Sequence, residues 1–277
     1  MRVVCRQLAY DDEAAPEQRR TAVAAQVARL GRDADLVVLP ELWSAGAFAP
    51  KGWAERAQPR DGAEGRALAG AARQAGCVVH GGSLVERDGE ELHNTAVLWG
   101  PDGRELAAYR KIHTFGAAGL ERELMTPGVE PCLLDLPLRA GDSVRVGLAT
   151  CYDLRFPELF RALVDGGAQV FVVAASWPAV RADAWRLLLR ARAVENQAYV
   201  VACAAAGVNG RTAMAGGSCV IGPDGQVRAA APSAADVPGG DRLGAPQAEL
   251  SATLDLAEIG RERAAFPVLP DRRLHRC

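Results

Sequence analysis

The two halves of the chain repeat one order of elements and one turn sequence, and this repetition limits the folds open to it. Each half is expected to hold a helix, a strand, a second helix and a second strand. In the first half these elements span Pro16–Leu30, Leu36–Leu39, Gly65–Ala75 and Cys77–His80. In the second half they span Pro157–Val164, Val170–Ala174, Asp183–Gln197 and Tyr199–Cys203. Both halves then continue to a Gly-Pro-Asp-Gly hairpin turn, at residues 100–103 and 222–225.

This repetition predicts how the halves pack. One half alone would leave a face of its sheet exposed, so the two sheets are expected to pack face to face with helices outside. A chain of 277 residues with 49% hydrophobic residues can bury a large core. We therefore expect an α/β protein, a four-layer α-β-β-α sandwich of two pseudo-symmetric halves, as a single domain over residues 1–277. Near the end we expect a surface loop, a strand and a helix, over Ala229–Gln247, Glu249–Leu254 and Leu256–Ala265.

Charge and cysteine content narrow the possible partners and compartment. The net charge of -2 gives no reason to expect a nucleic acid or an anionic membrane surface as partner. No apolar stretch approaches the ~20 residues of a membrane helix, and the N-terminus does not resemble a signal peptide. The cysteines number seven, and an odd number does not indicate a disulfide framework. Four of them lie in apolar, strand-like surroundings and are expected to fill the core: Cys5, Cys77, Cys203 and Cys219. A reducing cytoplasm fits this pattern.

No motif indicates a metal or an organic cofactor. The chain has no Cys-x-x-Cys pair and no His-Glu-x-x-His helix, and its four histidines are scattered. Its glycine-rich pieces, such as Gly81-Gly82-Ser83, lack the spacing of dinucleotide or phosphate loops. We therefore expect no cofactor.

Cys151 is the first candidate for chemistry. It follows a strand-like run, Val144–Ala149, and precedes Pro157 and Glu158, which suit the first turn of a helix. Free backbone N–H groups at a strand-to-helix turn favour a thiolate and can bind a developing oxyanion. On position alone, the alternative is a buried core cysteine.

Glu41 and Lys111 are the second and third candidates. Glu41 comes directly after an apolar strand and Pro40, so it should lie at the rim of a core, where burial raises the pKa of a carboxyl group toward the range of a general base. Its alternative is a structural ion pair. Lys111 and Lys51 are the chain's only lysines, among 32 Lys and Arg residues in total. A compact ammonium can sit between two carboxylates and donate to an oxyanion, which a planar guanidinium cannot do in the same space. The alternative for Lys111 is a solvated strand end.

Together these residues supply a nucleophile, a base and a cation for acyl transfer through a thioester. The segments "LPELW", "YRKIH" and "CYDLRFPEL" resemble, in this order, the Glu-Lys-Cys motifs of the nitrilase superfamily of carbon-nitrogen hydrolases. The resemblance covers nearly the whole chain and implies the same four-layer fold. It implies Glu41 as base, Cys151 as nucleophile, and an oxyanion held by Lys111 and the Tyr152 backbone N–H. It also implies a homodimer or higher homo-oligomer, with the Arg-rich tail after Pro270 on a partner subunit.

The resemblance implies further site residues. A second glutamate after the lysine motif matches Glu121 in "ERELMTPG", with Glu123 as the neighbouring alternative. Arg155 and Glu158 are expected to form a buried structural ion pair rather than to bind substrate. Trp177 and Phe48 are expected to wall the substrate pocket, and core packing is the alternative for both.

The segment "ASWPAVRADAWRLLLRARAVENQAYVVA" is most similar to the omega-amidase branch of the superfamily. This implies a small carboxylate-bearing amide as substrate, such as 2-oxoglutaramate, with release of ammonia and with Arg181 as a candidate for the substrate carboxylate. The loop from His113 to Leu120 departs from the branch. The alternatives are a deaminated-glutathione amidase, an N-carbamoyl amino acid amidohydrolase and, less in keeping with the motifs, a nitrile hydrolase. From other classes, a catalytically inactive interaction module and a Cys-His hydrolase using His113 also stay open.

Overall fold

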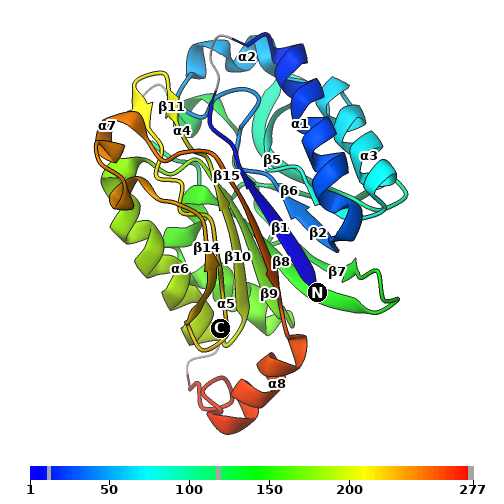
Figure 1. Ribbon diagram of the computed structural model, residues 1–277, viewed down its shortest axis with the longest axis vertical. Coiled ribbons are helices and arrows are strands. Elements are labelled where there is room, and N and C mark those ends of the chain that lie inside the picture. Colours follow the sequence, from blue (N-terminus) through cyan, green and yellow to red (C-terminus); the bar gives the residue numbers. More distant parts are fainter. Residues whose placement is uncertain (11–13, 117–119, 274–277) are drawn as a thin grey trace.

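Two sheets pack face to face, with helices on their outer faces (Figure 1). The computed structural model describes residues 1–10, 14–116 and 120–273. The last four residues of the Arg-rich tail, which was expected to contact a partner, lie outside this range, as do residues 117–119 of the loop that departs from the omega-amidase branch. In Figure 1, α1 (Pro16–Leu30) and α3 (Ala63–Ala75) lie on one side of the strands and α6 (Ala182–Asn196) on the other. The expected four-layer α-β-β-α arrangement is confirmed.

The first sheet has seven strands in the order β15-β1-β2-β3-β5-β4, and β6 also pairs with β5. The strands β1, β2 and β3 run parallel, whereas β15 and β5 are antiparallel to their neighbours. Their bounds are Arg2–Gln7 (β1), Leu36–Val38 (β2), Val78–His80 (β3), Leu84–Asp88 (β4), Glu91–Trp99 (β5), Glu105–Arg110 (β6) and Ala248–Thr253 (β15).

The second sheet has six strands in the order β14-β13-β10-β9-β8-β7, of which β8, β9 and β10 run parallel. Their bounds are Leu133–Pro137 (β7), Ser143–Thr150 (β8), Val170–Ala175 (β9), Tyr199–Ala204 (β10), Cys219–Ile221 (β13) and Val227–Ala230 (β14). A separate short pair joins Val208–Asn209 (β11) to Thr212–Ala213 (β12).

The remaining helices are short, except for α5 and α8. Their bounds are Trp53–Arg56 (α2), Glu121–Leu124 (α4), Pro157–Asp165 (α5), Gly240–Leu243 (α7) and Leu256–Ala265 (α8). Within the described residues, none of the helices has the length and apolar character needed to cross a bilayer.

Alternation along the strands divides the core into layers. In β1, Val3 and Cys5 face the core between the sheets, while Val4 packs with α1 and α3. On the second sheet Val172 faces the central core, and Val173 packs with the helices α5 and α6. The four cysteines expected in the core are buried, which confirms that prediction: Cys5, Cys77, Cys203 and Cys219.

The segment Ala229–Gln247 is not the surface loop expected from its composition. It completes β14 and contains α7, and Ser233, Ala234 and Ala245 are buried. The buried Gln7 side chain donates to the carbonyl groups of residues 232 and 246 and so binds the segment to β1. The segment also lies close to the loop after β10, because a Cβ added at Gly244 would lie 1.9 Å from the Gly207 carbonyl oxygen.

Candidate active site

Cys151 lies at the junction of β8 and a short 3-10 turn, Cys151–Arg155, that leads into α5. Its φ is +47°, a left-handed conformation that is uncommon for residues other than glycine. The Asp153 side chain accepts from the Thr150 N–H at 2.9 Å and so closes a capping box around the turn. Pro157 then occupies the start of α5. The expected strand-to-helix presentation of Cys151 is confirmed.

Asp153 also ties this turn to the segment after β6. Its buried carboxylate accepts from the Tyr109 hydroxyl at 2.7 Å and from the His113 backbone N–H at 3.0 Å. The His113 ring contacts the same carboxylate through Nδ1 at 2.7 Å and stacks on Phe156. Asp153 is thus the orienting carboxylate that the sequence did not point to for His113. The described contacts of the Cys151 thiol, however, are with the Ser176 carbonyl oxygen at 3.8 Å and with Glu41, not with His113.

Lys111 lies between two carboxylates in the interior. Its Nζ is 2.7 Å from Glu41 Oε1 and 2.7 Å from Glu121 Oε2, and the three side chains are 1%, 3% and 6% exposed. Burial would lower the pKa of Lys111, but the two carboxylates outweigh it and raise this pKa well above its ordinary value. Burial, together with the Glu41 charge, raises the pKa of Glu121. Glu123 is exposed on α4, so Glu121 is the glutamate that lies beside Lys111.

Backbone and side-chain donors fix the two carboxylates, and the sequence analysis missed them. The Asn94 amide nitrogen donates to Glu41 Oε1 at 2.9 Å and to Glu121 Oε1. The Ser176 N–H donates to Glu41 Oε2 at 2.8 Å, and the Phe115 N–H donates to Glu121 Oε2 at 2.7 Å. Asn94 stands between two other polar residues in the first half of β5, so no clear sequence signal marked it, whereas a serine directly after β9 was the signal for Ser176.

The thiol of Cys151 is held in its protonated form. Burial and the charge of Glu41 raise its pKa well above the ordinary value, and the Lys111 ammonium only partly opposes them. Burial and the Glu41 charge thus favour the thiol over the thiolate that the turn was expected to favour. A carboxylate that can accept the thiol proton lies beside it instead.

Two small cavities, each about 20 Å³, meet at Cys151. The first is lined by the charged groups Glu41, Lys111 and Glu121. The second is lined by Tyr152, Trp177 and Arg181, which were expected to bind or wall a substrate, and by Arg155, which was not. The side chains of Phe48 and Phe115 line both cavities, and their rings lie 6.3 Å apart.

The expected buried ion pair between Arg155 and Glu158 is wrong. Both side chains are exposed, and no ion pair joins them among the described residues. Glu158 is on the first turn of α5, on its solvent side. The Arg155 guanidinium instead lies 5.0 Å from the centre of the Trp177 ring, at the wall of the second cavity.

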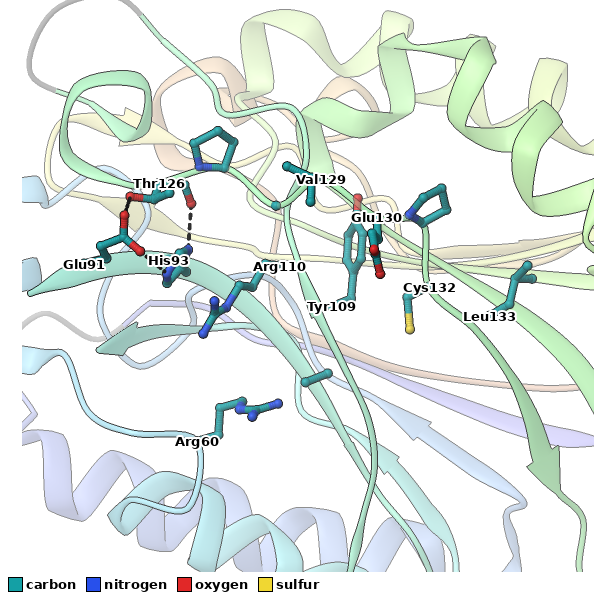
Figure 2. Close-up of a pocket in the computed structure, with 14 residues that line it drawn as sticks. Arg60, Glu91, His93, Tyr109, Arg110, Thr126, Val129, Glu130, Cys132 and Leu133 are labelled. Atoms are coloured by element: carbon teal, nitrogen blue, oxygen red, sulfur yellow. Dashed lines mark hydrogen bonds and ion pairs between the residues drawn. The ribbon is translucent and has the colours of Figure 1, made fainter. Parts of the chain in front are cut away.

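A larger cavity of about 640 Å³ lies apart from these groups, between β6 and residues 126–133 (Figure 2). Figure 2 shows His93 and Glu91 beside Thr126, with Arg60 and Arg110 on the neighbouring wall. The two arginines are already paired with acidic side chains, and the cavity holds neither Cys151 nor Glu41. Among the residues that the structure describes, no cluster of three or more His, Cys, Asp or Glu side chains could hold a metal ion.

Comparison with known proteins gives one consistent result. Residues 2–239 match the family described as carbon-nitrogen hydrolase. The chain is 35% identical over 271 residues to the 2-oxoglutaramate amidase of Paenarthrobacter nicotinovorans, covering 96% of this chain and 87% of that protein. It is 32% identical over 248 residues to omega-amidase NIT2 of Homo sapiens, covering 87% and 83%.

Solved structures of similar proteins have the same fold. XC1258 of Xanthomonas campestris, a CN-hydrolase superfamily protein with an arsenic adduct in its active site, superposes with a TM-score of 0.85 at 28% identity, covering 100% of this chain and 98% of that one. A mutant amidase of Nesterenkonia sp. AN1, in which acrylamide has added to the active-site cysteine, superposes with a TM-score of 0.78 at 27% identity, covering 96% and 98%.

Proposed function

The chain belongs to the carbon-nitrogen hydrolase family, and we propose that it is a thiol amidase for the monoamide of a short dicarboxylate, such as 2-oxoglutaramate. The observation that carries this proposal is the meeting of two kinds of group at Cys151. On one side lie a carboxylate and an ammonium, Glu41 and Lys111. On the other side lie two basic residues that line the second cavity, Arg155 and Arg181.

The proposed reaction begins with proton transfer from the Cys151 thiol to Glu41. The sulfur attacks the amide carbonyl carbon, and the resulting oxyanion is bound by Lys111 Nζ and the Tyr152 N–H. Glu41 then gives its proton to the nitrogen, the C–N bond breaks, and ammonia leaves a thioester on Cys151. Glu41 next takes a proton from water, which attacks the thioester. The C–S bond breaks, the carboxylic acid leaves, and the proton returns to sulfur.

Glu121 supports this cycle through Lys111. Two carboxylates beside one ammonium keep Lys111 protonated in an interior that would otherwise favour the neutral amine. A protonated Lys111 can donate to the substrate oxygen in every step that forms an oxyanion. We therefore assign Glu121 to the catalytic group with Glu41, Lys111 and Cys151.

The second cavity supports a substrate with a distal carboxylate. Guanidinium groups bind carboxylates with two parallel hydrogen bonds, and both Arg155 and Arg181 line this cavity. Phe48 and Trp177 supply apolar walls for the short carbon chain between the amide and the carboxylate. Cys151 lies at the junction of the two cavities, where the amide carbon would have to be.

Ammonia release from paired amides tests the substrate class. We expect kcat/KM for 2-oxoglutaramate to exceed that for pentanamide, a neutral amide of equal chain length, by about 10-fold or more, the value of one charge-assisted pair. Arg155→Met and Arg181→Met should raise KM for the acid substrate, whereas Arg66→Met, at an exposed residue of α3, should not. Equal kcat/KM for the two amides would reject the substrate class. Deaminated glutathione and an N-carbamoyl amino acid should be assayed in the same way, because they are the substrates of the two alternative activities.

Replacement of Cys151 by alanine tests the chemistry separately. We expect the variant to fold and to release no ammonia, because the nucleophile is lost while the turn keeps a small side chain. Wild-type enzyme mixed briefly with substrate should show a mass increase equal to the acyl group. Substantial turnover by Cys151→Ala would reject the thioester route.

We propose further that the protein is a cytoplasmic homodimer or higher homo-oligomer. Six described cysteines are unpaired, which suits a reducing compartment. Leu187 and Val194 on α6 are 69% and 50% exposed and lie seven residues apart, on one face of the helix. Light scattering should give a mass of at least twice the chain mass of 29.2 kDa, and Leu187→Glu should shift it toward the monomer. A wild-type monomer at micromolar concentration would reject the assembly.

A further inference from the structure

Asn94 contacts all three charged residues of the site. It lies on β5 and is 2% exposed. Its backbone carbonyl accepts from the Lys111 N–H at 2.9 Å. Its amide nitrogen donates to Glu41 Oε1 at 2.9 Å and also to Glu121 Oε1. One side chain therefore joins the two carboxylates, and its backbone fixes the start of the lysine side chain.

The chemistry of the neighbours determines which end of the amide faces the site. Ionised carboxylates only accept hydrogen bonds, so the amide nitrogen must point to Glu41 and Glu121. The other end, Asn94 Oδ1, is buried and has no hydrogen-bond partner among the residues that the structure describes. An unsatisfied buried oxygen is destabilising, and an apolar residue at this place on the strand would avoid that cost. The retained amide points to a role in the site rather than in packing.

The balance of donors and acceptors suggests what that role is. An ammonium has three N–H donors, and two of those on Lys111 bind Glu41 Oε1 and Glu121 Oε2. The third stays available for the substrate oxygen. Without the Asn94 amide, the vacated lone pairs on Glu41 Oε1 and Glu121 Oε1 would compete for this third donor. The two carboxylates would also lose a shared hydrogen-bond donor and keep only the Lys111 ammonium between them. Loss of a hydrogen bond to a carboxylate disfavours its ionised form.

We propose that Asn94 is a positioning residue of the hydrolase, which keeps one Lys111 donor free for the oxyanion and holds the Glu41 carboxylate in place as the base. The proposal rests on the roles proposed above for Glu41, Lys111 and Cys151. Asn94 itself touches neither the substrate carbonyl nor the sulfur; it acts through the three charged side chains.

Two substitutions separate the amide donor from the volume that it fills. Asn94→Leu removes the donor and keeps a similar volume, and Asn94→Asp keeps the shape but replaces the donor with an acceptor. Thr95→Val is the matched control, because Thr95 is the next residue on β5, is equally buried, and donates to Glu86 rather than to the site. We expect Asn94→Leu to lower kcat by about 10- to 100-fold, with KM within about threefold of wild type. The upper figure corresponds to the loss of one oxyanion donor. Thr95→Val should keep kcat within about twofold.

The pH profile distinguishes positioning from a structural role. Loss of a hydrogen-bond donor to a carboxylate disfavours its ionised form, so the acid limb of kcat/KM should move to higher pH in Asn94→Leu and further in Asn94→Asp. The same shift should occur in the rate of Cys151 alkylation by iodoacetamide, which needs Glu41 but no amide substrate. A lower kcat with an unmoved acid limb in both assays would overturn the proposal. Retained turnover in Cys151→Ala would instead reject the proposed function, while a shifted alkylation profile would still support the role of Asn94.

Discussion

Lys111 should tolerate a change of shape poorly, because its buried ammonium lies between two buried carboxylates. Arginine would conserve the positive charge but not the volume. Lys111→Arg should lower kcat by about 10²-fold or more, the loss of one preorganised donor. Lys111 is among the largest fully buried side chains, so the added volume should also cost about 1–3 kcal/mol in the free energy of unfolding.

The other lysine of the chain supplies the control for that substitution. Lys51 is exposed, so Lys51→Arg should leave both kcat and the melting temperature near wild type. Steady-state ammonia release and thermal unfolding measure the two effects. If Lys111→Arg kept kcat within a few-fold of wild type, Lys111 could not be the oxyanion donor, and its contacts with Glu41 and Glu121 would be structural only.

The protonated thiol predicts how Cys151 should react with alkylating agents. Because its pKa is raised well above the ordinary value, reaction near neutral pH must depend on proton transfer to Glu41. Glu41→Gln should slow iodoacetamide labelling of Cys151 at pH 7 by about 10²-fold or more, the low end for a general base. Cys132 is partly exposed, so a Cys132→Ser background keeps its label out of the intact-mass spectrum. Equal labelling rates with Glu41 and with glutamine would show that the carboxylate does not activate the sulfur.

At the scale of elements, the turn between β8 and α5 depends on a carboxylate that does not touch the substrate. Asp153 is 0% exposed and accepts hydrogen bonds from Thr150, Tyr109 and His113. Asp153→Ala would leave these buried donors without a partner and should lower the free energy of unfolding by about 3 kcal/mol or more. It should also lower kcat, because the left-handed Cys151 loses its cap. Asp165→Ala, at an exposed carboxylate of α5, should have little effect on either quantity, and equal unfolding free energies in the two variants would contradict the role of Asp153.

The first turn of α3 makes stability depend on pH. Burial raises the pKa of Glu64 to about 7, although a hydrogen bond from Ser44 and the charges of Arg20 and Arg19 partly oppose this. The folded pKa lies above the unfolded value of about 4.3, so the native state binds more protons between these values. This stabilisation is therefore fully present below pH ~4.3 and is lost as the pH rises through 7, a loss of roughly 4 kcal/mol at most.

Glu64→Gln tests this dependence, because glutamine stays neutral. The variant should be more stable than wild type at pH 8, and its melting temperature should change less between pH 5 and pH 8. Glu55→Gln, at an exposed residue of α2, is the control for the loss of one negative charge. Parallel melting curves for Glu64→Gln and wild type across this range would contradict the raised pKa.

The sequence predicted best the elements whose ends are set locally. The helices Pro16–Leu30 and Leu256–Ala265 have the expected bounds, since Pro16 opens the first and the Asp255 side chain caps the second. Both Gly-Pro-Asp-Gly turns formed, and their last glycines, Gly103 and Gly225, adopt nearly equal φ values of 77° and 78°. Local chemistry suffices in these places.

Features that depend on distant contacts were not predictable in the same way. Burial of Ser233 and Ala245 requires the Gln7 side chain more than 220 residues away in sequence. The motifs placed Glu41, Lys111 and Cys151 in the site, but Asn94 lies between His93 and Thr95 in the polar first half of β5, where nothing in the sequence sets it apart. Arg155 was expected in an ion pair, whereas its position over Trp177 depends on where the segment after β9 runs.

At the scale of the whole molecule, the repeat explains why neither half is expected to fold alone. The central core mixes residues of both sheets, such as Val38 and Leu98 from the first and Val146 and Val172 from the second. Separation of the sheets would expose this entire layer to water. The N-terminal strand β1 also pairs along its full length with β15, so the two ends of the chain complete one sheet edge together.

A single domain over residues 1–277 stays a prediction, and calorimetry tests it. One shared core should unfold in one cooperative transition, with equal calorimetric and van't Hoff enthalpies for each cooperative unit. Leu250 of β15 contributes to the central core, so Leu250→Ala should cost about 2–5 kcal/mol and lower the temperature of the whole transition rather than split it. Phe266→Ala, at a side chain that is 69% exposed, should leave the transition in place. Two separable transitions, with only the first displaced by Leu250→Ala, would mean that the two sheets are independent folding units and that the chain holds more than one domain.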